Sequence, residues 1–354
     1  MNKPKPWLDK IIKIKPYIPG EQPDKNNVIK LNTNESPYPP SPMAKEVLKG
    51  YDTDKLRLYP SFECNELKEV LAEIYNINKN NLFFGNGSDE VIALCFQTFF
   101  NSDIPILIPD ITYSFYDVWC NLYNIKYEQI FLDENFNIKK EDYFKENGGV
   151  VIANPNAPVG KYMELCELEE IINYNKSSIV IIDEAYIDFG GKSAVSLINK
   201  YDNLVVVHTF SKSRSLAGIR FGYAMCNAEL VGYIETVKNS FNSYTINSLT
   251  QAVALACAKD KEYFEYCRKK IINTRERVVS ELYEIGFTII PSMCNFIFAT
   301  NPKVKASFIF DELKKQNIYV RYFNKPRINE YLRITIGTDE EMDSLIAALK
   351  KIIN

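Results

Sequence analysis

The most informative segment of this sequence reads His208-Thr-Phe-Ser-Lys-Ser-Arg-Ser-Leu-Ala-Gly-Ile-Arg-Phe-Gly-Tyr223. It continues the run Leu204-Val-Val-Val207, whose apolar and β-branched residues are typical of a buried strand. Lys212 is therefore expected at the mouth of that strand. Partial burial or a neighbouring cation lowers the pKa of a lysine and frees its amine. Such an amine can form a Schiff base with a carbonyl compound.

Arg220 follows Lys212 across a loop that contains Gly218. Together with Ser211, its guanidinium could hold a phosphate, because both groups donate hydrogen bonds to oxyanions. A lysine for an aldehyde and an arginine for a phosphate indicate pyridoxal phosphate (PLP). Taken alone, the same residues would equally describe a strand end followed by a surface ion pair.

A second apolar run supports the cofactor hypothesis. It reads Ser178-Ile-Val-Ile-Ile-Asp-Glu-Ala-Tyr186 and predicts a buried strand that ends close to Asp183 and Tyr186. An aspartate that faces a pyridine nitrogen keeps it protonated and makes the ring a better electron sink, and a tyrosine hydroxyl can donate to the phenolate oxygen of the ring. We therefore predict that Asp183 and Tyr186 act together with Lys212.

Further motifs follow one another over nearly the whole chain. They are Leu31-Asn-Thr-Asn-Glu-Ser-Pro37, Arg57-Leu-Tyr-Pro60, Gly85-Asn-Gly-Ser-Asp-Glu90, Thr112-Tyr-Ser-Phe-Tyr116, Asn154-Pro-Asn-Ala-Pro-Val-Gly160 and Tyr331-Leu-Arg-Ile-Thr-Ile-Gly337. With the lysine and aspartate segments, they resemble the fold-type I PLP-dependent aminotransferases, most closely the histidinol-phosphate aminotransferase family. The resemblance implies an α/β fold in which helices flank a mostly parallel, seven-stranded-type sheet, with a smaller α/β domain. It also implies a cytoplasmic homodimer with shared active sites.

The activity that this resemblance implies is ping-pong Schiff-base chemistry on Lys212. L-Histidinol phosphate and 2-oxoglutarate would be interconverted with imidazole-acetol phosphate and L-glutamate, a step of histidine biosynthesis. Two related activities share the motifs, namely threonine-phosphate decarboxylase of the cobalamin pathway and aromatic amino acid aminotransferase. A PLP-binding protein without turnover is a further alternative.

One segment departs from the family and motivates that last alternative. Where the family commonly has Asn-Asn-Pro-Thr-Gly, this chain has Asn156-Ala-Pro-Val-Gly160. Ala157 stands at the position whose asparagine donates to the cofactor phenolate. The resemblance then leaves the interaction to Tyr186, alone or with Asn154 or Asn156.

The segment Leu82 to Leu94 predicts a short strand, a glycine turn and the start of a helix. The unpaired N–H groups and the dipole at a helix N-terminus favour a phosphate. Gly87, Ser88 and Asp89 are the candidates, although Ser88 could be an ordinary N-cap. Tyr113 is predicted to stack on the pyridine ring, since aromatic rings pack favourably face to face with an offset.

Arg333 lies between Leu332 and Ile334, so it points away from the face that these apolar neighbours bury. It offers a two-pronged clamp for a carboxylate or phosphate, and the matching arginine of the family holds the substrate anion. By the same resemblance Arg321, Tyr17 and Asn34 contact substrate. Tyr59 would reach the cofactor phosphate of the neighbouring subunit.

The proline-rich N-terminal segment through Pro16-Tyr-Ile-Pro-Gly20 is expected to be an extended arm that lies on another subunit. We predict three regions: residues 1–44, the arm and part of the small domain; 45–250, the large PLP-binding domain; and 251–354, the small C-terminal domain. His208, the single histidine, is expected to be a hydrogen-bonded core group, and proton transfer is assigned to Lys212. Arg214 stays an unassigned charge near the site.

Composition argues against several other functions. The 42 basic and 45 acidic residues are interspersed and give a net charge of −3, whereas nucleic-acid binders concentrate positive charge. No apolar run approaches the roughly 18 residues of a membrane span. The 8 cysteines lack C-x-x-C spacing and, with one histidine, predict reduced thiols and no metal site. We expect amine and 2-oxo acid substrates, no nucleic acid and no membrane.

Overall fold

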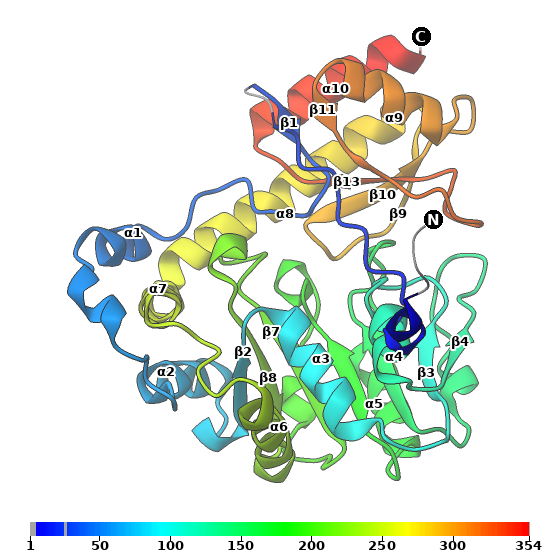
Figure 1. Cartoon of the computed structure of the whole chain (residues 1–354). Coiled ribbons are helices and arrows are strands. Elements are labelled where there is room, and N and C mark those ends of the chain that lie inside the picture. The colour runs from blue at the N-terminus through cyan, green and yellow to red at the C-terminus, as the bar shows by residue number, and fades with distance from the viewer. Residues whose placement is uncertain (1–4, 25–26, 354) are drawn as a thin grey trace.

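A seven-stranded sheet organises the larger part of the chain (Figure 1). The structure is a computed structural model that describes residues 5–24 and 27–353, so the predicted arm is described without residues 1–4 and 25–26. The strands lie in the order β2-β8-β7-β6-β5-β3-β4, and β8 runs antiparallel to both of its neighbours while the other described pairs are parallel. Their bounds are Leu82–Gly85 (β2), Ile106–Pro109 (β3), Tyr127–Ile130 (β4), Gly149–Ala153 (β5), Val180–Asp183 (β6), Leu204–Thr209 (β7) and Gly222–Cys226 (β8). The predicted mostly parallel sheet is confirmed.

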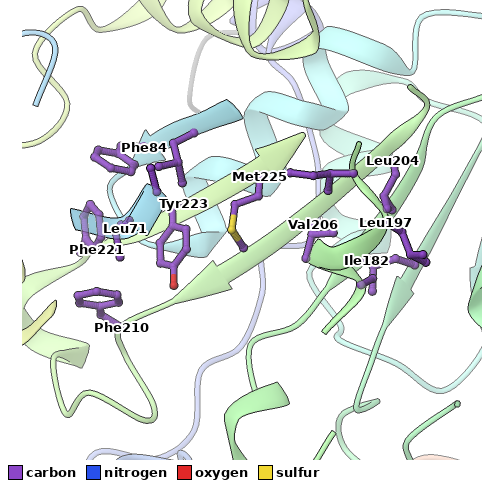
Figure 2. Close-up of a cluster of buried hydrophobic side chains, with 14 of the residues drawn as sticks. Leu71, Phe84, Ile182, Leu197, Leu204, Val206, Phe210, Phe221, Tyr223 and Met225 are labelled. Carbon is purple, nitrogen blue, oxygen red and sulfur yellow. The ribbon is translucent and has the colours of Figure 1, made fainter. Parts of the chain in front are cut away.

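Helices cover both faces of this sheet, which is why its central strands are apolar along their whole length. Along β7, Val206 points to the face covered by α2, α5 and α7, and Val205 and Val207 point to the face covered by α3, α4 and α6. Figure 2 shows the first face, where Leu71 and Phe84 gather with other apolar side chains. The helices are α2 (Asn65–Tyr75), α3 (Ser88–Phe99), α4 (Tyr116–Tyr123), α5 (Leu165–Tyr174), α6 (Ala228–Phe241) and α7 (Ser248–Lys259).

Helix α6 was not predicted from the sequence. Gly232 and several β-branched residues lower its intrinsic helix propensity. Tertiary packing overrides this, because Leu230 and Ile234 are buried against the sheet. The Asn227 side chain also accepts a hydrogen bond from the Leu230 amide and caps the first turn.

The smaller part of the chain contains a four-stranded antiparallel sheet and a two-stranded parallel one (Figure 1). The first has the order β12-β13-β10-β9, with bounds Arg321–Tyr322, Leu332–Thr335, Phe296–Thr300 and Thr288–Ile290. The second pairs β1 (Ile29–Lys30) with β11 (Ile318–Tyr319), so segments from opposite ends of the sequence lie side by side. The helices of this part are α8 (Lys261–Glu284), α9 (Ala306–Lys315) and α10 (Asp339–Ile353), whereas α1 (Pro42–Lys49) packs against α7 of the larger part. The neighbouring short strands β11 and β12 therefore belong to different sheets.

Two helix starts are fixed by side-chain hydrogen bonds. Ser41 caps α1 by accepting from the Met43 amide, and Pro42 occupies the first turn. At α10 the Glu341 amide donates to Thr338 Oγ1 while the Thr338 amide donates to Glu341 Oε2, a reciprocal capping box. None of the helices within the described residues is both long and apolar enough to cross a membrane.

Candidate active site

A cavity of about 1180 Å³ opens at the carboxyl ends of the central strands and is closed on its other side by the smaller part of the chain. Ligands bind at this edge of open α/β sheets. Most of the predicted site residues line it: Tyr17, Asn34, Ser88, Asp89, Tyr113, Asp183, Tyr186, Ser211, Lys212, Arg220, Arg321 and Arg333. Among the residues that the structure describes, Tyr59, Gly87, Asn154 and Asn156 are not part of the lining.

Lys212 follows the end of β7 and extends into the cavity. Its Nζ donates to the Thr33 carbonyl oxygen at 3.3 Å and lies 5.7 Å from the centre of the Tyr186 ring. Burial, reinforced by the positive charge of Arg333, lowers the pKa of Lys212 to about 8. A substantial fraction of this amine is therefore neutral near physiological pH.

Asp183 ends β6 and is buried at the floor of the cavity. Its carboxylate accepts hydrogen bonds from Tyr116 Oη at 2.7 Å and from the Ala185 amide at 3.1 Å. Burial outweighs these donors and raises the pKa of Asp183 to about 6. Such a carboxylate is stabilised by a cationic partner. Tyr116 was missed from the sequence, although it closes the motif from which Tyr113 was chosen.

The Tyr186 hydroxyl also reaches the cavity. Its oxygen accepts a hydrogen bond from Asn34 Nδ2 at 2.9 Å, and burial raises the pKa of Tyr186 above its usual range. The phenol therefore keeps its proton and can donate it to another acceptor. Asn34 is held in turn by Thr335, whose Oγ1 donates to Asn34 Oδ1 at 3.1 Å.

An anion cradle forms where α3 begins. Gly87 occupies the N-cap position with a φ of +84°, so Ser88 is the first helical residue and not the cap. Arg220 packs so closely here that a Cβ on Gly87 would lie 2.5 Å from its Nη2. A Cβ on Gly222 would lie 2.3 Å from the Ser88 nitrogen. Both glycines are needed for this close approach, and Gly222 was not predicted from the sequence.

The cradle combines several donors. Arg220 Nη2 pairs with Asp89 at 3.0 Å, and Asp89 also accepts from Tyr113 Oη at 2.9 Å. Thr209, a second residue that was not predicted, lines the cavity and donates from Oγ1 to Ser211 Oγ at 2.9 Å. The Ser211 hydroxyl hydrogen is therefore available to an anion, as are the first amides of α3.

Arg333 on β13 supplies a second cationic group. Its Nη2 donates to the Asn32 carbonyl at 2.9 Å, and its buried Nε has no hydrogen-bond partner among the described residues. The guanidinium lies 5.4 Å from the centre of the Phe296 ring. Burial lowers the pKa of Arg333. A buried guanidinium with unused donor capacity is suited to an incoming anion.

The N-terminal arm lies across the cavity of its own chain, whereas the sequence predicted that it lies on another subunit. Tyr17 stacks on Phe115 with ring centres 4.2 Å apart. Arg321 donates to the carbonyl oxygens of Ile18 and Pro19 at 3.4 and 3.5 Å. In this arrangement Arg321 anchors the arm, and Tyr17 forms part of the cavity wall.

Residues 26–349 match the family model described as aminotransferase class I and II. The chain belongs to this family. It is 52% identical over 347 residues to the histidinol-phosphate aminotransferase of Clostridium acetobutylicum, covering 98% of this chain and 99% of that relative. It is 51% identical over 345 residues to the enzyme of the same name from Lactococcus lactis subsp. cremoris, covering 98% and 97%.

The fold of the chain is also that of a solved aminotransferase structure. The crystal structure of histidinol-phosphate aminotransferase from Sinorhizobium meliloti, in complex with pyridoxal-5′-phosphate, superposes with a TM-score of 0.84 at 22% identity and covers 92% of this chain and 90% of that chain. The predicted fold type I of PLP-dependent transferases is confirmed. The domain boundaries stay a prediction.

In this aminotransferase the side chains of the two asparagines near Ala157 form hydrogen bonds with neighbouring loop residues. Asn154 Nδ2 donates to the Met163 carbonyl at 3.0 Å, and its Oδ1 accepts from the Met163 amide at 2.8 Å. Asn156 Nδ2 donates to the Ile111 carbonyl at 2.8 Å, and its Oδ1 accepts from Thr112 Oγ1 at 2.9 Å. Both side chains hold loop backbone and neither reaches the cavity, whereas Ala157 does line it.

Two other side chains near the aminotransferase site serve the scaffold. His208 is buried, with Nε2 2.7 Å from Glu184 Oε2 and Nδ1 3.1 Å from Tyr75 Oη. It is the hydrogen-bonded core group that was expected. Arg214 donates to the Cys257 carbonyl at 2.8 Å and lies 4.1 Å from the centre of the Phe264 ring, so it fastens the lysine loop to α7 and α8.

Tyr59 lies away from the cavity of its own chain. It is 82% exposed, and its ring stacks on Tyr244 with centres 4.6 Å apart. Within the described residues, no group of at least 3 His, Cys, Asp or Glu side chains is arranged to hold a metal ion.

Proposed function

We propose that this aminotransferase binds PLP and transfers the amino group of L-histidinol phosphate to 2-oxoglutarate, giving imidazole-acetol phosphate and L-glutamate. This is a step of histidine biosynthesis. The observation that carries the proposal is that Lys212, Asp183 and Arg333 line one cavity in a chain about half identical to curated histidinol-phosphate aminotransferases. Arg333 and the cradle at Arg220 give the cavity two separate anion sites. One suits the phosphate of a cofactor and the other the phosphate or carboxylate of a substrate.

The residues present fit PLP. Arg220, Ser211 and the first amides of α3 would hold its phosphate, with Thr209 and Ser88 beside them. Asp183 would face the ring nitrogen, because its buried carboxylate needs a cationic partner. Tyr186 would donate to the phenolate oxygen in place of the asparagine that Ala157 replaces, and Tyr113 would pack on the ring. When bound, PLP supplies an aldehyde that captures amines and a ring that accepts an electron pair.

The remaining work falls to three side chains. The neutral Nζ of Lys212 would accept the proton from the substrate carbon that carries the amino group. As an ammonium group, Lys212 would then donate this proton again within the cavity. The negative charge of the Asp183 carboxylate would keep the ring nitrogen of PLP protonated. Arg333 orients the substrate by its anionic group, so that the carbon faces Lys212. A role as a mere PLP-binding protein would need neither the proton carrier nor the clamp.

The lowered pKa of Lys212 predicts the pH dependence of cofactor uptake. The ammonium form has no lone pair, so capture of PLP by the cofactor-free protein should become faster as pH rises, with a midpoint at about pH 8 and a plateau above it. An ordinary lysine, with a pKa of 10.5, would continue to gain rate well above that pH. Stopped-flow absorbance across a pH series measures the midpoint. Reaction of PLP with free acetyl-lysine in the same buffers corrects for titration of PLP itself, and a corrected midpoint near 10.5 would contradict the prediction.

Gly87→Ala tests the anion cradle. The new Cβ would meet Arg220 at 2.5 Å, and the φ of +84° is strained for alanine. We expect the dissociation constant for PLP to rise about tenfold or more, as expected when a charge-assisted contact worth roughly 1.5–3 kcal/mol is displaced. Gly232→Ala in α6 is the matched control, because no atom lies within 4 Å of its added Cβ. Equal PLP affinities for the two variants would remove Gly87 from the cradle.

We further propose a homodimer in which Tyr59 of each subunit reaches the partner's cavity. The exposure of Tyr59 on its own chain supports this arrangement. We also propose a cytoplasmic location, which the reduced state of all 8 cysteines supports.

The test of the reaction is a set of half-reactions with the PLP-loaded protein. Histidinol phosphate, threonine phosphate and phenylalanine are added separately, and the cofactor absorbance and the products are followed. We expect rapid conversion of the cofactor to its amine form by histidinol phosphate, with 2-oxoglutarate restoring it. Release of carbon dioxide from threonine phosphate would instead assign the decarboxylase, and preference for phenylalanine would assign the aromatic aminotransferase.

A further inference from the structure

Arg327 makes a set of contacts at the mouth of the cavity that the chemistry above does not use. It lies in the loop between β12 and β13, which we call the 323–331 loop. Arg327 Nη1 pairs with Asp110 Oδ2 at 2.7 Å, and Nη2 donates to the carbonyl oxygens of Leu132 and Asp133 at 2.7 and 2.8 Å. Asp110 follows β3, and Leu132 and Asp133 follow β4. One guanidinium thus joins the smaller part of the chain to two neighbouring strand ends of the large sheet.

The groups that accept hydrogen bonds from Arg327 are also held in place by a hydrogen bond to each other. Asp110 Oδ1 accepts from the Leu132 amide at 2.9 Å, so the carboxylate and the carbonyl form one frame. The Asp110 side chain is only 10% exposed, which limits screening of the ion pair by solvent. Arg327 itself has a φ of +71°, in the left-handed region that a residue with a Cβ occupies only when its surroundings hold it there.

An apolar cluster lies next to this ion pair and joins the same two parts. Ile328 is buried beside Ile111 and Phe136. The Tyr331 ring stacks on Phe298 at 4.6 Å and meets the edge of Phe136 at 5.5 Å. Apolar burial holds the two parts together without fixing a direction, whereas the three hydrogen bonds of Arg327 are directional. The ion pair therefore sets the orientation of the 323–331 loop on the large sheet.

The orientation of this loop affects where the side chains of Arg321 and Arg333 point. Arg321 lies two residues before the loop on β12, and Arg333 lies two residues after it on β13. Phe323, at the start of the loop, lies beneath both guanidinium groups, with its ring centre 5.3 Å from Arg321 and 5.5 Å from Arg333. A shift of the loop would move this aromatic support, and a displacement of about 1 Å in a positioning group can cost on the order of 10²-fold in rate.

We propose that Arg327 is a positioning residue for the anionic substrate. By fastening the 323–331 loop to Asp110 and to the Leu132–Asp133 backbone, it aligns Arg333 over Lys212 and so sets the affinity for the phosphate or carboxylate of the substrate. Arg327 touches neither cofactor nor reacting atoms in this role. The inference rests on the proposed function, since it takes Arg333 as the substrate clamp.

The experiment compares Arg327→Ala, Arg327→Lys and Arg277→Ala in the PLP-loaded protein. Arg277 is the matched control, because it also forms ion pairs within the smaller part of the chain, with Glu281, Asp339 and Asp343, but lies away from the cavity. For Arg327→Ala we expect the KM for histidinol phosphate to rise about tenfold, with kcat changed by less than about threefold. Arg327→Lys keeps the charge without the fork, so its KM should be intermediate. Amide hydrogen exchange in residues 321–333 should be faster in Arg327→Ala than in Arg277→Ala.

The possible failures can be told apart. If the unaltered protein does not convert histidinol phosphate, the proposed function fails, and KM is then measured with the amine that the half-reactions identify. If the unaltered protein is active but Arg327→Ala has the KM of Arg277→Ala, the positioning role is overturned. A fall in kcat at constant KM, or unchanged hydrogen exchange in the loop, would overturn it as well.

Discussion

Lys212→Ala will abolish transamination while the protein keeps its fold. The variant would lose the amine that we propose captures the cofactor aldehyde and moves the substrate proton, so we expect kcat to fall by about 10⁴-fold or more. Turnover of histidinol phosphate measures the loss, and circular dichroism checks the fold. Lys200→Ala, which removes an exposed lysine paired with Glu169, is the control and should retain full activity. Activity of Lys212→Ala within tenfold of the unaltered protein would exclude Lys212 as the reacting amine.

The same variant has a signature in stability. The pKa of Lys212 is about 8 in the folded protein and near 10.5 in an ordinary environment. Between these values the unfolded chain binds the proton more strongly, so this lysine makes the cofactor-free protein more stable as pH rises through that window. In Lys212→Ala this contribution is absent. Thermal unfolding of the cofactor-free proteins at about pH 8 and at about pH 10.5 should therefore show the unaltered chain gaining stability relative to the variant as pH rises between these two values.

Arg333→Ala will weaken binding of the anionic substrate. Two charge-assisted hydrogen bonds, each worth roughly 1.5–3 kcal/mol, would be lost, so we expect KM for histidinol phosphate to rise about 10²-fold or more. Arg333→Lys should recover only part of this, because an ammonium group cannot form the fork. An unchanged KM in Arg333→Ala would remove Arg333 from the substrate site.

A second measurement separates this clamp from a structural role. Arg333 is among the groups that lower the pKa of Lys212, so Arg333→Ala should move the midpoint of PLP capture above about pH 8. Since burial already lowers the pKa of the arginine, its removal also relieves a poorly solvated charge. The free energy of unfolding should consequently fall by no more than about 1 kcal/mol. A large loss of stability with an unmoved midpoint would indicate that Arg333 acts only through packing.

Local patterns carried most of the fold prediction. The apolar runs that precede Asp183 and His208 identified two buried strands, because a strand covered on both faces is apolar throughout. Helix α6 was not predicted because its stability comes from packing against the sheet and not from the helix propensity of its own residues. The cavity residues on strand ends were likewise found from short segments.

Side-chain contacts between residues far apart in the sequence could not be predicted from local sequence patterns. Nothing near Arg327 in the sequence indicates that its partner is Asp110. Tyr116 could have been found from its motif, but its bond to Asp183 needs the sheet order to be known. The motif of Asn154 and Asn156 likewise points to the cofactor but does not reveal that their side chains hydrogen-bond to nearby loop backbone.

The pairing of β1 with β11 has a consequence for biosynthesis of the protein on the ribosome. Ile29 and Lys30 pair with Ile318 and Tyr319, and the next few residues after β1 contribute Thr33, which binds Lys212, and Asn34, which binds Tyr186. All strands of the seven-stranded sheet lie between β1 and β11 in the sequence, so the nascent chain must keep β1 unpaired until the whole of that sheet has been synthesised. The amine of Lys212 therefore acquires its final surroundings only after β11, more distant in the sequence than Lys212 itself, has been synthesised.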